Sequence, residues 1–362
     1  MSERVFNFNP GPSTLPLEVL KEAQKDLLNY ANTGMSVMEV SHRSKEFQAI
    51  VQEAEEQIKE LLGLGDDHRV LFLHGGASTQ FSMIPQNFLT EDTVANYIVS
   101  GSFAQKAYKE SVKVGQTHLA GSTKDVNHNR IVGTDEVTLS DNPAYVHITS
   151  NNTIFGTQWK DFPDFGDVPL IADMSSDILS KPFDASKFAL IYAGAQKNLG
   201  PSGVAVVIIR KDMLEKVPES LPSMLRYDIM AENNSLYNTP PSFSIYMVNL
   251  VLKWIKKQGG LEGIAAHNEE KAGYVYDAID NSDAFYAGHA EKPDRSLMNI
   301  TFRLPNEDLE KTFVTEAAKK GLAGLKGHRS VGGIRASIYN AMTKEGCKAL
   351  ADFMDEFRLA NK

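Results

Sequence analysis

One stretch near the middle of the chain constrains the fold most: two apolar runs joined by a glycine-rich loop that carries a lysine. Phe188 to Ala193 forms one continuous apolar run, and Gly203 to Ile209 forms a second one that is rich in β-branched residues. Such runs are typical of strands buried on both faces of a sheet. The glycines around Lys197 would allow the backbone to approach a ligand closely. We therefore expect Lys197 at the end of a buried strand.

The sequence around Lys197 leaves two explanations of its chemistry open. A lysine that is partly removed from water has a lowered pKa, so a useful fraction of it is the neutral amine. Such an amine can form a Schiff base with an aldehyde or a ketone. The other explanation is an ordinary loop lysine, because most lysines lie in solvent. This stretch alone does not decide between the two.

Strand-like runs alternate with helical patterns over the first two thirds of the chain. Besides the strands that flank Lys197, we predict strands at residues 69–74, 93–99, 144–149 and 168–172. This alternation is typical of an α/β fold, in which helices cover a mostly parallel sheet. The pattern changes after Arg210, where residues 211–245 look irregular and a smaller α+β region follows. For 362 residues with 42% hydrophobic content, we expect an N-terminal arm at 1–15, a large domain at 16–258 and a small domain at 259–362.

Residues that can cap helices mark three predicted helix starts. Ser44 precedes a strongly amphipathic helix, and Thr343 precedes the terminal one. Ser13 or Thr14 is expected to cap a helix near the N-terminus. Its buried face is expected to carry four leucines, Leu17, Leu20, Leu27 and Leu28.

Charge and residue usage argue against several classes of protein. The formal net charge of −9 argues against a general nucleic-acid or membrane-surface binder. The single cysteine, Cys347, allows no intramolecular disulfide, and its helical spacing with apolar residues places it in the core. No apolar run is long enough to cross a bilayer and no secretory signal is visible, so we expect a cytoplasmic protein. The nine histidines form no metal-ligand pair, and we predict no metal site.

Residues with useful chemistry follow several of the predicted strands directly. Ligands bind beyond the carboxyl ends of such strands, so these residues are expected to share one crevice. Gly75-Gly-Ala-Ser-Thr79 offers backbone N–H groups to an anion such as phosphate, although it could be only a tight turn. Phe103 would stack on a flat ligand or belong to the core. Asp173 would pair with a pyridinium nitrogen or cap a turn.

The order of these parts along the chain fits a site for pyridoxal 5′-phosphate (PLP): an anion loop, an aromatic residue, an aspartate and then Lys197. Two His-Arg-Ser tripeptides, at 42–44 and 328–330, lie outside this set, and Arg335 follows the second. Guanidinium groups bind carboxylate and phosphate through paired hydrogen bonds. These arginines would suit a substrate with several anionic groups, although any single one could be surface charge.

Long motifs then identify a family that the chain resembles. They are Phe8-Asn-Pro-Gly-Pro12, Met38-Glu-Val-Ser-His-Arg43, Phe72-Leu-His-Gly-Gly-Ala-Ser78, Asp173-Met-Ser-Ser-Asp177, Tyr192-Ala-Gly-Ala-Gln-Lys-Asn-Leu-Gly-Pro-Ser-Gly203, Tyr237-Asn-Thr-Pro-Pro241 and Gly327-His-Arg-Ser-Val-Gly-Gly-Ile-Arg-Ala336. Over nearly its whole length the chain resembles the phosphoserine aminotransferase family. The members of that family are fold-type I PLP enzymes among the class V aminotransferases.

The resemblance implies a role for each candidate residue. Lys197 would hold PLP covalently and move a proton between the substrate α-carbon and the cofactor. Asp173 would pair with the pyridine nitrogen, Thr153 would bond the ring hydroxyl, and Phe103 would stack on the ring, where the family usually has tryptophan. The cofactor phosphate would be held by Gly76, Ala77, Ser78 and Gln196, together with the partner subunit's Asn238 and Thr239 in a homodimer. The substrate phosphate and carboxylates would be bound by His42, Arg43, His328, Arg329 and Arg335.

The reaction implied by the resemblance is the transamination of 3-phosphooxypyruvate with L-glutamate in serine biosynthesis. It gives O-phospho-L-serine and 2-oxoglutarate by a ping-pong mechanism. In many bacteria the same enzyme also acts on 4-phosphooxy-L-threonine in pyridoxine biosynthesis. The sequence leaves open whether this chain does so.

Two other kinds of function remain open on the residues alone. A cysteine desulfurase or an alanine-type aminotransferase would share the fold, but the first needs a nucleophilic cysteine on a mobile loop and the second does not need paired His-Arg segments. A non-enzymatic module that binds sugar phosphates or carboxylates could use the same anion loops. Such a module would bind its ligand without a covalent link, so Lys197→Ala would leave binding unaffected.

Overall fold

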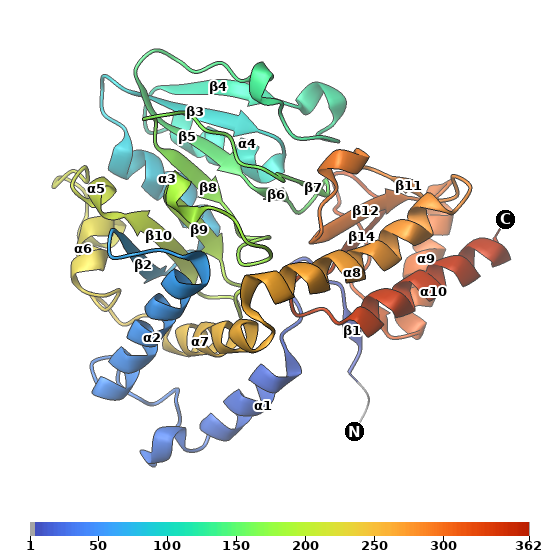
Figure 1. Cartoon of the computed structure of the whole chain (residues 1–362), viewed down its shortest axis with the longest axis horizontal. Coiled ribbons are helices and arrows are strands. Elements are labelled where there is room, and N and C mark those ends of the chain that lie inside the picture. Colours follow the sequence, from blue (N-terminus) through green and yellow to red (C-terminus); the bar gives the residue numbers. More distant parts are fainter. Residues whose placement is uncertain (1–3, 362) are drawn as a thin grey trace.

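A seven-stranded sheet forms the centre of the fold in the computed structural model, which describes residues 4–361 (Figure 1). In spatial order its strands are β2 (His68–Leu73), β10 (Ala205–Arg210), β9 (Phe188–Gly194), β8 (Leu170–Asp173), β5 (Pro143–Thr149), β3 (Val94–Val99) and β4 (Thr117–Ser122). β10 runs antiparallel to both of its neighbours, and the other neighbouring pairs are parallel. The predicted mostly parallel α/β sheet is therefore confirmed. β4 was not predicted, because its edge position leaves most of its residues only half-buried and it has no apolar run.

Helices cover both faces of the sheet. Because side chains along a strand alternate between the two faces, neighbouring residues of β2 belong to different hydrophobic cores. On β2, Val70 and Phe72 belong to a core that also contains residues of α2 (Lys45–Leu62) and α7 (Ser242–Lys257). Leu71 and Leu73 belong to a second core. That core contains residues of α3 (Gly76–Phe88) and α4 (Ser102–Val112). All seven residues of β9 are buried, so the apolar run before Lys197 does mark a strand between two layers.

The C-terminal third forms a smaller α+β arrangement (Figure 1). Its antiparallel sheet is made of β11 (Ala287–Gly288), β12 (Asn299–Arg303) and β14 (Ile334–Ser337). Its helices are α8 (Gly260–Asp280), α9 (Glu307–Lys319) and α10 (Lys344–Ala360). Cys347 is buried in the core between these elements, as predicted, and burial raises the pKa of its thiol to about 12.

The N-terminal segment crosses from the smaller sheet region to the lysine loop. Strand β1 (Phe6–Asn7) pairs with β13 (Leu322–Ala323), and Phe8 is buried in the C-terminal core. The segment then reaches the Lys197 loop, where Ser13 N donates to Gln196 O at 3.0 Å. The domain boundaries at residues 15 and 258 stay predictions. Residues 1–3 of the predicted arm and residue 362 of the predicted small domain lie outside the described part.

The helix starts agree with the prediction in two of three cases. Ser44 Oγ accepts from Phe47 N, and Thr343 Oγ1 accepts from Gly346 N, so both predicted caps form. The expectation for α1 (Leu17–Asp26) was wrong, because no side chain of the described residues caps it. Three of the four leucines expected on its buried face are exposed, namely Leu17, Leu27 and Leu28. The helix ends at residue 26, so Leu27 and Leu28 lie beyond it and do not share its helical spacing. The residues that α1 buries are Val19 and Ala23.

Two short helices lie where the sequence predicted irregular structure, α5 (Lys211–Leu214) and α6 (Tyr227–Glu232). A two-stranded ribbon, β6 (Asn151–Asn152) with β7 (Thr157–Gln158), follows β5 and carries Thr153 in its turn. None of the helices in residues 4–361 combines the length and the apolar character that a membrane-spanning helix needs.

Candidate active site

The carboxyl ends of five strands meet at one edge of the large sheet and surround a cavity of about 380 Å³. The strands are β2, β3, β5, β8 and β9, which all point the same way. The expected crevice beyond the strand ends is therefore present. The cavity lining includes eight of the predicted site residues, Gly76, Ala77, Ser78, Phe103, Thr153, Asp173, Gln196 and Lys197.

Lys197 follows β9 and extends its side chain into this cavity. Its Nζ donates a hydrogen bond to Thr153 Oγ1 at 2.7 Å and lies 5.2 Å from the centre of the Phe103 ring. Burial lowers the pKa of Lys197 to about 8, although the nearby Asp173 charge opposes this shift. The neutral, nucleophilic amine is therefore more abundant than in a solvated lysine.

Asp173 is the last residue of β8 and lines the same cavity. Its side chain is 5% exposed, and Oδ1 accepts a hydrogen bond from Ser175 N at 2.9 Å. Burial raises the pKa of Asp173, while the Ser175 hydrogen bonds and the Lys197 charge act in the opposite direction. Within residues 4–361 it forms no direct ion pair. This carboxylate is thus available to a positively charged atom of a ligand.

The turn from β2 into α3 offers a place for an anion. Gly75 has φ of +82°, and a Cβ at this position would lie 1.9 Å from Thr79 Oγ1. Only glycine fits there. The first N–H groups of a helix have no partners within the helix and carry partial positive charge. The first turn of α3 has no acidic residue, and residues 75–78 line the cavity. The turn can therefore hold a phosphate group.

Arg335 is a buried cation without a counterion. It lies on β14 opposite Thr301 and is 7% exposed. Its side chain makes no hydrogen bond or ion pair within residues 4–361, and its Nε is fully buried. Its charge lowers the pKa of both Lys197 and His328. Because a buried charge is costly unless it is paired, Arg335 indicates a site for an anionic ligand.

The two His-Arg pairs do not line the Lys197 cavity. His328 and Arg329 lie on the loop 327–333, beside a hollow of about 550 Å³ that also borders α9. Burial and the charges of Arg335, Arg329 and Lys106 lower the pKa of His328. Lys106 Nζ lies 5.1 Å from the centre of the Phe103 ring, which lines the Lys197 cavity. His42 and Arg43 border a separate hollow of about 440 Å³ beside α2.

Asn238 and Thr239 also lie outside the lining of the Lys197 cavity of their own chain. They are close to the end of β2, where His74 Nε2 donates to Thr239 O at 3.1 Å. The structure therefore brings together eight of the predicted cofactor residues. Asn238, Thr239 and the five predicted substrate-binding residues lie outside the lining of this cavity.

The N-terminal segment contributes to the site in a way that the sequence did not indicate. Gly11 and Pro12 line the cavity, and Ser13 Oγ donates to Lys197 O at 2.8 Å. Ser175 was also missed as a structural link, since its Oγ accepts from Gly194 N at 3.0 Å. Ser13 directly follows the motif Phe8–Pro12, and Ser175 lies within the motif Asp173–Asp177, but each contacts a residue far away in the sequence. A local sequence pattern does not predict such contacts.

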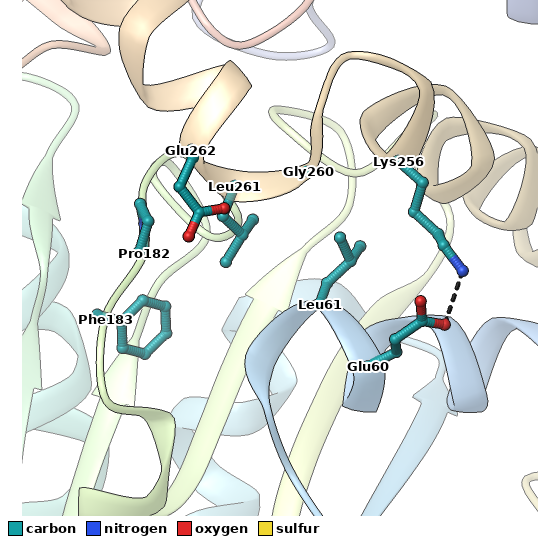
Figure 2. Close-up of a pocket in the computed structure, with 8 residues that line it drawn as sticks. All are labelled: Glu60, Leu61, Pro182, Phe183, Lys256, Gly260, Leu261 and Glu262. Atoms are coloured by element: carbon teal, nitrogen blue, oxygen red, sulfur yellow. Dashed lines mark hydrogen bonds and ion pairs between the residues drawn. The ribbon is translucent and has the colours of Figure 1, made fainter.

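Another hollow has the wrong chemistry for a catalytic site (Figure 2). It lies between α2, the end of α7 and the start of α8. Figure 2 shows Glu60 and Lys256 pointing toward each other, and their atoms form an ion pair at 2.6 Å. Among the described residues, the only cation that lines the hollow, Lys256, is therefore already paired with Glu60, and no unpaired cation here calls for an anionic ligand. Across residues 4–361 no group of three or more His, Cys, Asp or Glu side chains is arranged to hold a metal ion.

Comparison with known proteins identifies close relatives. Residues 5–350 match the Aminotransferase class-V family. A phosphoserine aminotransferase of Herpetosiphon aurantiacus is 60% identical and covers 98% of both chains. The solved phosphoserine aminotransferase of Bacillus circulans subsp. alkalophilus is 57% identical, with a TM-score of 0.98 and 100% of both chains covered. A PLP-bound phosphoserine aminotransferase from Trichomonas vaginalis is 40% identical, with a TM-score of 0.92, over 97% of this chain and 100% of that chain.

Proposed function

Because the chain belongs to the class-V aminotransferase family, and within it to the phosphoserine aminotransferases, we propose that the Lys197 cavity transfers the amino group of L-glutamate to 3-phosphooxypyruvate with PLP as cofactor. The products are O-phospho-L-serine and 2-oxoglutarate, and the reaction belongs to serine biosynthesis. The observation that supports this substrate class is Arg335, a buried cation without a counterion in residues 4–361, whose charge lowers the pKa of Lys197. A substrate with carboxylate and phosphate groups supplies the missing negative charge.

The residues of the cavity fit PLP in charge and in shape. The unpaired Asp173 carboxylate would hold the protonated pyridine nitrogen, and the start of α3 with Gln196 would hold the phosphate. The Phe103 ring would cover one face of the cofactor, and Thr153 would bond the ring hydroxyl. When bound, PLP supplies an electron sink that stabilises negative charge at the substrate α-carbon.

Lys197 would hold the cofactor covalently and carry the proton at the α-carbon. A proton carrier works best when its pKa is near the operating pH, and burial lowers the pKa of this amine to about 8. Thr153 Oγ1, at 2.7 Å from Nζ, holds the amine in the cavity when it is free. Ser13 fixes the backbone of the same residue. These contacts support Lys197 as the catalytic residue.

The substrate anions would be divided between several cations. Arg335 would bind the α-carboxylate next to Lys197, and His328 and Arg329 would bind the phosphate from their loop. His42 and Arg43 lie in a separate hollow of their own chain. We assign them to the substrate phosphate of the partner subunit's site.

Members of this family are typically dimeric, and the finer assembly is part of the proposal. Asn238 and Thr239 lie outside their own cavity and would complete the cofactor site of the partner subunit. Several large apolar side chains are exposed near the N-terminus and near these two residues, as expected of an interface. They are Leu17, Leu27, Leu28, Met35, Met38, Met224 and Tyr237. We place the dimer in the cytoplasm.

A spectroscopic titration tests this function. Purified holoenzyme is mixed separately with O-phospho-L-serine, L-glutamate and L-alanine, and the loss of the cofactor absorbance band is followed. The first two are expected to convert the cofactor to its amine form, and L-alanine is expected to leave the band intact. A band that L-alanine bleaches best would reject the proposed anion recognition. Adding 4-phosphooxy-L-threonine to the series decides whether the chain also accepts that substrate.

The rate of PLP uptake by the cofactor-free protein is expected to depend on pH. Only the neutral amine attacks the aldehyde, and burial lowers the pKa of Lys197 to about 8. The neutral fraction grows as the pH rises through the pKa, so the uptake rate should rise between about pH 7 and pH 9 and then level off. Stopped-flow absorbance measures this rate. A profile that keeps rising to about pH 10.5 would show that the amine is an ordinary solvated lysine.

Of the alternatives, a cysteine desulfurase disagrees with the position of the thiol. Cys347 is the single cysteine, and it is buried within α10 rather than placed on a loop. Burial raises the pKa of this thiol to about 12, so it is a poor nucleophile. The non-enzymatic binding module is tested by the Lys197 variant in the Discussion.

A further inference from the structure

The loop 327–333, which carries His328 and Arg329, is shaped by hydrogen bonds within itself, including those between His328 and Ser330, but these bonds do not attach it to the rest of the domain. Its ends are joined by a hydrogen bond from Gly327 N to Gly333 O at 2.8 Å, and Gly332 N donates to His328 O at 2.8 Å. Arg329 and Ser330, at its tip, are exposed. A loop with so few buried contacts takes its position from the groups that pack against it.

Two residues outside the loop bind the backbone of its second half. Arg303, at the end of β12, donates from Nη1 to Val331 O at 2.8 Å. Glu310, on α9, accepts from Gly333 N at 3.1 Å through Oε2. The two side chains also bind each other, since Arg303 Nε donates to Glu310 Oε1 at 2.6 Å. Together they fasten two successive parts of the loop to β12 and α9.

The loop backbone lies so close to Arg303 that two glycines are required. Gly333 has φ of +71°, and a Cβ there would lie 2.6 Å from both Arg303 Cδ and Phe302 O. At Gly332, with φ of +75°, a Cβ would lie 3.1 Å from Arg303 Nη1. The close approach allows the guanidinium group to reach a backbone carbonyl that a larger residue would hold away.

Glu310 is not an ordinary surface carboxylate. It is 7% exposed, whereas exposed ion pairs contribute little to stability. A buried carboxylate is costly unless several donors satisfy it, and here Arg303 and Gly333 do so, with Leu304 N at 3.4 Å. The Arg303 side chain is 43% exposed, so the pair is only half-buried, and it is the buried carboxylate with its three donors that fixes one arrangement of the groups around it. Neither Arg303 nor Glu310 lines the Lys197 cavity.

We propose that Arg303 and Glu310 are positioning residues that hold His328 and Arg329 where they meet the substrate phosphate. This inference rests on the proposed function, which assigns the phosphate to that loop. The pair acts on substrate affinity rather than on the chemical step, because neither residue reaches Lys197 or the cofactor cavity.

Glu310→Gln tests the pair with almost no change in shape. Glutamine has one acceptor oxygen and one NH₂ group, so it cannot accept from both Arg303 and Gly333 as the carboxylate does. In the half-reaction of the holoenzyme with O-phospho-L-serine, we expect the Kd to rise about tenfold and the limiting rate to stay unchanged. A tenfold rise corresponds to the loss of about one charge-assisted hydrogen bond. Glu316→Gln, at an exposed position of the same helix, is the matched control and should change neither value.

A conservative variant separates positioning from folding. Arg303→Lys keeps a positive charge opposite Glu310 but cannot bind both Glu310 and Val331 O with a rigid fork. Its Kd for O-phospho-L-serine should lie between those of the wild type and Glu310→Gln, with unchanged thermal unfolding. A fall in the limiting rate that matches the rise in Kd, together with a lower unfolding temperature, would indicate a merely structural pair and overturn the proposal.

A double-mutant cycle shows whether the pair acts through the loop. In the Arg329→Ala background, Glu310→Gln should weaken O-phospho-L-serine binding by less than it does alone, because one of the groups that it positions is gone. Full additivity would overturn the positioning role. If Arg329→Ala weakens binding and Glu310→Gln does not, positioning is wrong and the proposed function stands. If Arg329→Ala itself has no effect, the assignment of the phosphate to this loop is wrong, and the positioning role fails with it.

Discussion

Lys197→Ala is expected to abolish transamination while the protein stays folded. The loss of a positioned proton carrier alone costs about 10²- to 10⁴-fold in kcat. The covalent hold on PLP is lost as well. Removing a partly buried amine also removes a charge that the cavity tolerates poorly, so the variant should be at least as resistant to unfolding as the wild type. Single-turnover absorbance with O-phospho-L-serine measures the rate, and thermal unfolding measures the stability.

Lys271 provides the matched control, because a lowered pKa alone does not make a lysine catalytic. It is fully buried on α8, and burial lowers its pKa to about 7. Its Nζ donates to Tyr339 O at 2.6 Å and to Met342 O at 3.3 Å, both in the segment between β14 and α10, and Lys271 does not line the Lys197 cavity. Lys271→Met should reduce stability and still form the covalent PLP link. Borohydride reduction followed by peptide mapping should place PLP on Lys197. Unchanged PLP binding by Lys197→Ala, with no reducible link in either protein, would support the non-enzymatic module. A reducible link that persists in Lys197→Ala would place PLP on another lysine, and either result would reject the proposed mechanism.

The parts of the site that were predictable are those encoded by local patterns. The apolar runs before Asp173 and Lys197 identified buried strands, and parallel strands have their carboxyl ends at one edge. In the β2–α3 turn Gly75 has no room for a side chain, and both Gly75 and Gly76 have a positive φ, so that turn could be recognised from residue type alone. These features need no knowledge of distant contacts.

The parts that were not predictable depend on contacts between distant residues. The bond from Ser13 to Lys197 O joins positions far apart in the chain. The role of the Arg303–Glu310 pair could not be predicted, because it depends on the contact of Arg303 with the loop 327–333. The strand β4 and the exposed leucines at and after α1 show the same limit, because an edge strand and exposed apolar residues do not follow the simple inside–outside rule. Sequence patterns report burial within one chain better than they report edges and interfaces.

Arg335→Met is expected to have opposite effects on stability and on substrate binding. In the substrate-free protein this guanidinium group is buried without a counterion, so its replacement by an apolar side chain should leave the unfolding free energy unchanged or raise it. The substrate carboxylate, however, loses its buried partner. We expect O-phospho-L-serine to bind more weakly by about 2–5 kcal/mol, or about 30- to 4,000-fold in Kd. Half-reaction titrations and chemical denaturation give the two values.

Arg295→Met is the matched control, since Arg295 is a poorly exposed arginine whose charge is already paired. Its guanidinium nitrogens contact Asp280 at 2.7 and 3.0 Å, so its loss should lower stability and leave substrate binding unchanged. A third readout is independent of the substrate. The Arg335 charge lowers the pKa of Lys197, so Arg335→Met should raise it and shift the pH profile of PLP uptake upward. If Arg335→Met behaves like Arg295→Met, with lower stability and unchanged binding and pH profile, then Arg335 is a structural residue and the substrate carboxylate is bound elsewhere.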